Sequence, residues 1–230
     1  VGYAAFRAFG ARAGTALAGL LGGVISSTAT TVSYARLTKT DETKSSSAVM
    51  IVWIASGVVF IRILLEIGAV APDFLPVAAG PLAAMLALFT VAAAFVWRSG
   101  TAPPDSPLEP GNPTELKPAI LFGALYAVVL LVVAAGQDWL GDVGLYFAAA
   151  ISGLTDVDAI TLSTSRLVDT GRLDPDTGWR VVLIAILSNL AFKLVLAASL
   201  GSRAFARRLG ALGAVALAAG VAVLLLWGAF

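Results

Sequence analysis

The sequence predicts an all-α transmembrane protein of about seven helices, arranged as two three-helix repeats joined by a connector helix. Three observations predict this class: a membrane-like composition, a series of long uncharged segments, and a resemblance between early and late segments of the chain. Of the 230 residues, 59% are hydrophobic and 13% are charged, and the mean hydropathy is +0.92. Soluble domains are about half apolar and about a quarter charged.

The missing residue types exclude several functions. The chain has no cysteine and no histidine, and its net charge is +1. These absences exclude disulfides, thiolate or imidazole metal sites, Ser-His-Asp triads and cysteine nucleophiles. A near-zero net charge gives no attraction to nucleic acid. The chain has no GxxxxGK[ST] motif, so ATP does not drive it directly. We expect neither an enzyme nor a permanently bound cofactor.

The predicted membrane segments are the long, mostly apolar stretches between charged residues, because a crossing helix needs ~20 mostly apolar residues. This gives seven predicted spans, at residues 13–35, 46–70, 74–97, 118–137, 143–165, 181–200 and 209–230. Residues 99–116 hold half of the ten prolines and predict an exposed loop. The predicted division is a first repeat at 1–98, a loop and connector helix at 99–140, and a second repeat at 141–230.

The membrane orientation follows from counting Lys and Arg in the predicted loops. Loops 36–45, 98–117 and 166–180 carry eight, and the opposite side carries five, three of them between residues 203 and 208. The larger set is expected in the cytoplasm.

An internal duplication is indicated by two pairs of segments. Residues 23–36 align with residues 153–166 without a gap and share five identities, among them Gly23 with Gly153 and Arg36 with Arg166. With a two-residue shift, Ile54 then lies over Ile186. Four crossings separate equivalent helices, so the repeats are predicted to be parallel, and one miscounted span would make them inverted.

Spans one and five are both rich in polar residues at their centres. Gly22 and Gly23 precede a run of Ser and Thr, and Gly153 precedes Thr155, Asp156 and Asp158. Glycine and short polar residues weaken a helix interior. We therefore expect both spans to be broken helices that restart near Ser27 and Asp156, which a membrane tolerates only in buried or cavity-lining positions.

The sharpest chemical signal is the pair Asp156 and Asp158, because a charge at the bilayer centre costs at least ~2.5 kcal/mol. Carboxylate, hydroxyl and carbonyl oxygens suit hard cations such as Mg²⁺, Mn²⁺ or Ca²⁺. We expect a metal site near midplane, between the breaks of spans one and five. Its predicted ligands are Asp156, Asp158, Ser26, Ser27, Thr28, Thr155 and Asn189, with Lys193 and Arg62 as counter-charges.

Other interpretations of these residues compete with a metal site. Asp156 and Ser27 would cap the restarted half-helices, or the acids would form a buried salt bridge with Lys193 or Arg62. A shorter span five would leave both acids in water. An intramembrane aspartyl protease is disfavoured, because its two carboxylates normally come from separate helices.

Several strings in this chain resemble a bacterial and archaeal membrane domain of unknown function. They are Gly22 to Thr31 (GGVISSTATT), Gly153 to Ile160 (GLTDVDAI), and Ser188-Asn189 with Lys193. That domain is often fused behind an MgtC/SapB-type membrane domain. The resemblance implies a polytopic inner-membrane protein associated with magnesium-related homeostasis.

These inferences predict a channel or secondary transporter for divalent metal cations in the inner membrane of a bacterium or archaeon. The alternative is a regulatory or scaffolding membrane subunit without flux of its own. Expected partners are the lipid bilayer, the cation, a second copy of the chain in a homodimer, and an MgtC/SapB-type domain.

Overall fold

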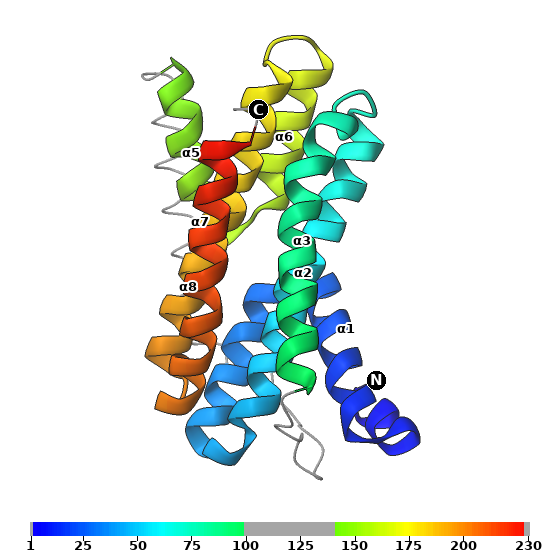
Figure 1. Cartoon of the computed structure of the whole chain (residues 1–230), viewed down its shortest axis with the longest axis vertical. Helices are drawn as coiled ribbons and strands as arrows, with labels where there is room; N and C mark the ends of the chain where they lie inside the picture. The colour runs from blue at the N-terminus through cyan, green and yellow to red at the C-terminus, as the bar shows by residue number, and fades with distance from the viewer. Residues whose placement is uncertain (1, 99–140, 228–230) are drawn as a thin grey trace. The chain divides into compact units, whose positions relative to one another are not determined.

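A computed structural model of the chain describes residues 2–98 and 141–227, with side chains for residues 12–98 and 144–227. This part of the chain is helical apart from short turns and contains no strand (Figure 1). The elements are α1 (Gly2–Thr40), the 3₁₀ helix η1 (Glu42–Lys44), α2 (Ser45–Val70), α3 (Leu75–Arg98), α5 (Gly141–Thr155), α6 (Asp158–Asp169), α7 (Pro175–Leu200) and α8 (Arg203–Leu226). The all-α class is confirmed, and the predicted loop and connector lie outside the described residues.

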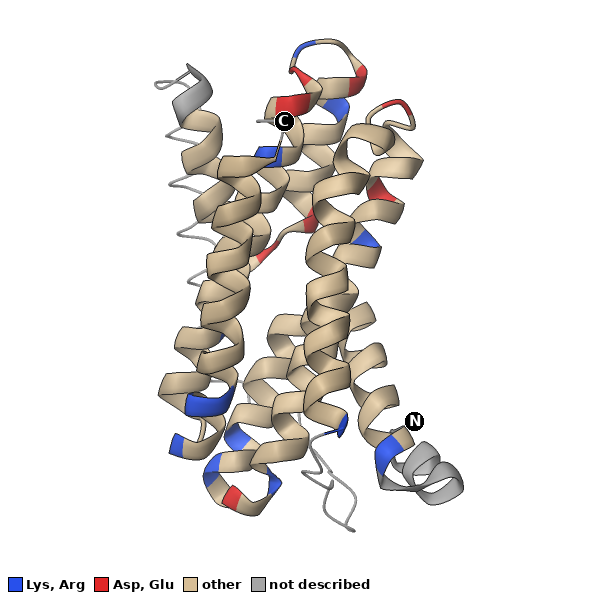
Figure 2. Cartoon of the chain, viewed as in Figure 1, with Lys and Arg blue, Asp and Glu red and all other residues tan. Residues whose placement is uncertain are grey.

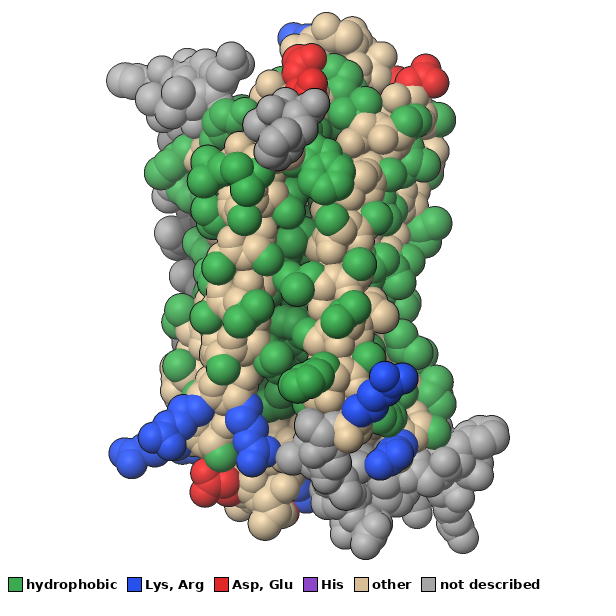
Figure 3. Space-filling model, viewed as in Figure 1, with side chains coloured by type: hydrophobic (Ala, Val, Ile, Leu, Met, Phe, Trp, Pro, Cys, Tyr) green, Lys and Arg blue, Asp and Glu red, His purple; other side chains and the backbone are tan. Residues whose placement is uncertain are grey.

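Five of the described helices are long and apolar enough to cross a membrane. They are α1 from Arg12 onward, α2, α3, α7 and α8. Helices α5 and α6 have 15 and 12 residues, so each is shorter than a crossing requires. Hydrophobic side chains dominate the helix surfaces visible in Figure 3. The chain is therefore a multi-pass membrane protein.

The described helices form two compact units. Among the described residues, the first unit contains 2–62, 84–98 and 193–218, and the second contains 63–83, 141–192 and 219–227. Helix α1 belongs to the first unit, and α5 and α6 belong to the second. Helices α2, α3, α7 and α8 each contribute one part to each unit.

Helix α1 folds back on itself within the first unit. A Cβ atom built on Gly22 would lie 2.5 Å from the Thr30 hydroxyl oxygen, whereas eight residues of a straight helix advance about 12 Å. Arg12 and Thr15 line a small cavity with Ser46 at the start of α2. The other end of α1, at Thr40, also joins the start of α2. Both ends of α1 therefore lie at one end of the first unit (Figure 1).

This turn corrects the prediction for span one in two ways. The helix was expected to break near Gly23, but its helical assignment runs without interruption from Gly2 to Thr40. It was also expected to cross the bilayer, and instead its axis reverses between Gly22 and Thr30. The first arm lies against α2, because a Cβ atom on Gly23 would be 2.6 Å from Val58 Cβ. Only glycine allows so close an approach.

An aromatic cluster packs α2 against α3 in the first unit. The Trp53 and Phe89 rings stack with centroids 4.2 Å apart, and the Trp53 indole N–H donates to the Phe89 carbonyl at 3.0 Å. Phe60 packs against the same Phe89 ring. Buried indole nitrogens normally need such a partner, so the hydrogen bond fixes the position of the ring.

Helices α2 and α7 run antiparallel within the first unit. The Lys193 ammonium lies 3.4 Å from the Ser56 hydroxyl, and just past the end of α7 the Ser202 hydroxyl lies 3.0 Å from that of Ser45, at the start of α2. Equivalent helices of parallel repeats would share a direction. The predicted parallel relation is therefore wrong for this pair, and the repeats have inverted topology. The cause is span five, which was counted as a crossing between α2 and α7 but consists of the two short helices α5 and α6, neither of them long enough to cross.

The helix bounds have the spacing of a duplicated chain. Adding 130 to the bounds of α2 gives those of α7, and α3 and α8 both have 24 residues. The same offset of 130 relates Gly23 to Gly153 and Ala55 to Ala185. It replaces the two-residue shift used to align Ile54 with Ile186.

Candidate functional site

The site begins at the link between α5 and α6 in the second unit. Helix α5 ends at Thr155, α6 begins at Asp158, and the link is Asp156 and Val157. Both acids of the predicted metal site therefore lie at this break, and acidic residues mark it in Figure 2. In Figure 1, α5 and α6 extend from the link toward the same end of the second unit. The break predicted for span five is thus present, and the two short helices form a hairpin.

The Asp156 carboxylate stabilises the start of α6. Its Oδ1 accepts a hydrogen bond from the Asp158 N–H at 2.9 Å, while the Asp156 N–H still donates to Ser152 O at 2.9 Å. The first N–H groups of a helix have no partner inside the helix, and the helix dipole favours a negative charge there. Capping, one of the predicted alternatives, therefore accounts for one oxygen of Asp156.

Capping leaves part of the Asp156 carboxylate available. The residue is half-buried, and in the part of the chain that the structure describes its side chain accepts only the Asp158 N–H. Among the described residues, Asp156 forms no ion pair with Lys or Arg. Its second carboxylate oxygen therefore accepts no hydrogen bond from the described residues.

Asn189 supports the link from α7. Its side-chain amide donates to the Gly153 carbonyl at 2.9 Å, and the residue is only 4% exposed. The neighbouring Ser188 hydroxyl donates to the Ala150 carbonyl. A Cβ atom on Gly153 would lie 2.6 Å from Ala185 Cα, so glycine is needed for this approach. Asn189 was predicted as a metal ligand; its amide nitrogen holds the end of α5, and binding of a metal by its side-chain oxygen stays a prediction.

The hydroxyls beside the link bond to their own backbone. The Thr155 hydroxyl lies 3.3 Å from Ser152 O, and the Ser152 hydroxyl lies 3.4 Å from Asp156 O. Ser and Thr commonly make such bonds in membrane helices. The hydroxyl of the predicted ligand Thr155 is a donor in this bond, so its oxygen keeps its lone pairs beside the acidic link.

The polar residues of α1 belong to the first unit and surround its turn. Ser26 Oγ accepts the Ala29 N–H at 3.2 Å, which is the bond of an N-cap residue. The Thr30 and Thr31 hydroxyls donate to the carbonyls of Ser26 and Ser27, both at 2.8 Å. Capping was expected from Ser27, and Ser26 provides it. In the duplicated register Ser26 corresponds to Asp156, so both hairpins use the same position for this purpose.

The remaining predicted ligands of the first unit, Ser27 and Thr28, are buried. Ser26, Ser27 and Thr28 belong to the first unit, whereas Asp156, Asp158, Thr155 and Asn189 belong to the second. Their meeting at one metal ion stays a prediction.

The predicted counter-charges Arg62 and Lys193 also belong to the first unit. Arg62 Nη1 donates to the Gly23 carbonyl at 3.2 Å, and Lys193, which is 2% exposed, lies 3.4 Å from the Ser56 hydroxyl. Their pairing with Asp156 or Asp158 stays a prediction.

Sequence comparison missed one correspondence between the hairpins. The Gly23 carbonyl accepts from Arg62 and the equivalent Gly153 carbonyl accepts from Asn189, so each hairpin is held by a donor from the next long helix. Arg62 and Asn189 differ in residue type. Their residue numbers also differ by 127, whereas the offset between the repeats is 130. No alignment could have paired them.

The donor set at the acidic link is oxygen only. No cluster of three or more His, Cys, Asp or Glu side chains occurs among the described residues. A bound cation would therefore keep several water molecules, as Mg²⁺ usually does.

Comparisons with known proteins agree with the membrane architecture. The family described as Domain of unknown function (DUF4010) matches residues 1–201, so the chain belongs to this family. An "Uncharacterized protein" of Aquifex aeolicus (strain VF5) is 28% identical over 189 residues, which cover 81% of this chain and 82% of the relative. No solved structure matches the chain.

Proposed function

We propose that this DUF4010 protein is a channel or secondary transporter for divalent metal cations, in which Asp156 and Asp158 bind the ion. The observation that carries the proposal is the Asp156 carboxylate at a helix break, half-buried and without an ion pair to Lys or Arg in the described part of the chain. Broken helices whose ends point at ions are typical of secondary transporters.

The inverted repeats also favour a transporter. Many secondary transporters contain two repeats of opposite orientation, each with a discontinuous helix beside the substrate site. Here α1 and the α5–α6 hairpin occupy equivalent positions in the two repeats, and each turns at a Gly followed by a capping residue, Ser26 or Asp156. The proposal assigns no catalysis. The predicted homodimer, MgtC/SapB-type partner and inner-membrane location remain predictions.

Flux measurements test the proposal. The purified protein is placed in liposomes that contain a Mg²⁺-sensitive dye. We expect it to let Mg²⁺ enter the liposomes, and we expect Mn²⁺ and Ca²⁺ to compete with Mg²⁺ for entry. Asp156→Asn and Asp158→Asn remove the charge but keep a similar shape, and we expect each to reduce flux at least about tenfold, because the ion loses a charged ligand.

Asp174→Asn is the matched control, since Asp174 is an exposed acid in the turn before α7 that caps this helix through the Thr177 N–H. Its flux should equal that of the wild type. Wild-type flux in the Asp156→Asn, Asp158→Asn double variant would exclude the proposed site. Absence of flux in the wild type with all three metals would favour the regulatory-subunit alternative.

A further inference from the structure

One end of the first unit gathers basic residues from distant parts of the chain. The Arg208 guanidinium donates to the Ser46 hydroxyl, and the Ser202 hydroxyl lies beside Ser45. Arg12, Ser46 and Trp97 line one small cavity. The starts of α2 and α8, the end of α3 and the N-terminal arm of α1 therefore meet there. The basic residues of this end are Arg12, Arg36, Lys39, Lys44, Arg98, Arg203, Arg207 and Arg208.

This arrangement corrects the loop count made from the sequence. Residues 203–208 were placed on the side opposite to the 36–45 loop, but the Ser202 N–H donates to the Thr38 hydroxyl at 3.1 Å. Most of the basic side chains are exposed, and Figures 2 and 3 show Lys and Arg concentrated around this end of the unit.

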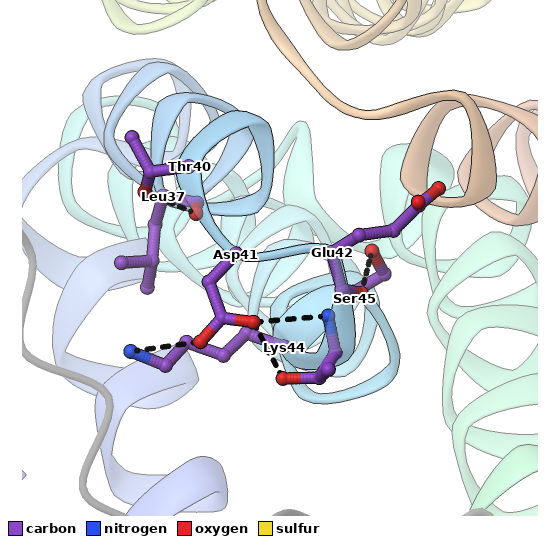
Figure 4. A network of polar contacts seen from close by, with 7 residues as sticks. Leu37, Thr40, Asp41, Glu42, Lys44 and Ser45 are labelled. Atoms are coloured by element: carbon purple, nitrogen blue, oxygen red, sulfur yellow. Dashed lines mark hydrogen bonds and ion pairs between the residues drawn. The ribbon is translucent and has the colours of Figure 1, made fainter.

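The acids at this end do not balance the basic residues. Among the described side chains they are Asp41 and Glu42. Asp41 accepts hydrogen bonds from the Thr43 hydroxyl and N–H, at 2.5 and 3.1 Å, and lies 3.6 Å from Lys44 Nζ (Figure 4). Asp41 therefore neutralises Lys44 locally, and seven further basic residues stand against one further described acid, Glu42.

The turns of the second unit carry charges of both signs. Phe74, at the α2–α3 turn, lies near Gly178 at the start of α7, so these two turns are neighbours. Their charged residues are Asp73, Arg166, Asp169, Arg172, Asp174, Asp176 and Arg180. Short loops rich in Lys and Arg stay in the cytoplasm during membrane insertion, and among the described turns those at the end of the first unit have such an excess.

We propose that the basic end of the first unit is the cytoplasmic face and rests on anionic phospholipid headgroups of the inner leaflet. Guanidinium and ammonium groups at the membrane surface are attracted to this leaflet within about one Debye length. Both ends of α1 then face the cytoplasm. Since α2 is long enough to cross, the α2–α3 turn at Asp73 faces the other side.

Single-cysteine labelling tests the orientation, because the chain has no cysteine of its own. Thr40→Cys places a thiol at the basic end, and Asp169→Cys places one at the end of α6. With a membrane-impermeant maleimide on intact cells, we expect labelling of Asp169→Cys only. Inside-out vesicles should give labelling of Thr40→Cys only. The reverse pattern, or equal labelling of both thiols, would overturn the proposal.

Two further measurements test the role of the charges. In Thr40→Cys protein, replacing Arg203, Arg207 and Arg208 by Gln should raise labelling on intact cells about tenfold, because fewer charges hold this end inside. In nanodiscs, phosphatidylglycerol should raise the thermal midpoint above that in pure phosphatidylcholine, and 0.5 M salt should remove most of the increase, a concentration at which the Debye length is only about 4 Å. Unchanged labelling or unchanged midpoints would contradict the assigned role.

Discussion

Asp156 has two separable roles, as a helix cap and as a charge. Asn keeps the hydrogen bond to the Asp158 N–H, whereas Ala loses it. We therefore expect Asp156→Ala to lower the free energy of unfolding by about 1 kcal/mol and Asp156→Asn to change it by less than about half of that. Thermal unfolding in detergent measures both. Equal destabilisation by Asn and Ala would show that the carboxylate does not act through this hydrogen bond.

The stability of the protein depends on pH through Asp41, which lies between the candidate membrane-spanning helices. The Thr43 hydroxyl, opposed by desolvation and assisted by the Thr43 N–H and Lys44, holds the pKa of Asp41 below its ordinary value of 3.8. A folded-state pKa below the unfolded one adds stability at neutral pH, and this stability is lost as the pH falls below 3.8 and through the lowered pKa.

The pKa of Asp41 is measurable from the carbon-13 shift of its carboxyl group. Thr43→Val removes the hydroxyl hydrogen bond, which is the largest cause of the lowered pKa, so the titration midpoint should move upward toward 3.8. The neighbouring Glu42 provides a reference within the same turn. An unchanged Asp41 midpoint in the variant would show that the hydroxyl does not stabilise the carboxylate.

At the scale of elements, the two hairpins depend on glycines that touch the next long helix. A Cβ atom on Gly23 would lie 2.6 Å from Val58 Cβ, and a Cβ atom on Gly153 would lie 2.6 Å from Ala185 Cα. We expect Gly23→Ala and Gly153→Ala each to lower the free energy of unfolding by about 1–3 kcal/mol, since overpacking forces the helices apart. Denaturant or thermal unfolding of the purified protein measures the change.

Gly210 in α8 is the matched control for these substitutions. A Cβ atom there meets nothing within 4 Å, so Gly210→Ala should stabilise the protein by about 0.5–1 kcal/mol through helix propensity. Stability gains at all three positions would mean that the hairpins do not pack against α2 and α7 as described.

The sequence predicts the position of both hairpin turns better than their shape. Gly153 and Asp156 correctly mark the end of α5 and the start of α6. Gly22 and Gly23 mark the turn of α1, but the helical hydrogen bonding continues through it. A segment of 23 uncharged residues looks the same whether it crosses or folds back. The difference lies in contacts with α2, such as that between Gly23 and Val58, which local sequence does not reveal.

For the whole molecule, the topology depends on how many segments cross the membrane between equivalent helices. Counting span five, the α5–α6 hairpin, as a crossing makes the repeats parallel and separates Arg203, Arg207 and Arg208 from the first basic loop. The contact between Ser45 and Ser202 reverses both conclusions. The membrane class could be predicted because it depends on composition alone. The relation between repeats could not, because it depends on the parity of the crossings.

The most direct test of the cation site is an experimental structure determined with Mn²⁺, using its anomalous scattering to locate the ion. The account predicts a peak within ~2.0–2.6 Å of a carboxylate oxygen of Asp156 or Asp158, completed mainly by water and hydroxyl oxygens, and lost in the double Asn variant. No peak at saturating Mn²⁺, with Asp156 closed off by a Lys or Arg side chain, would contradict it.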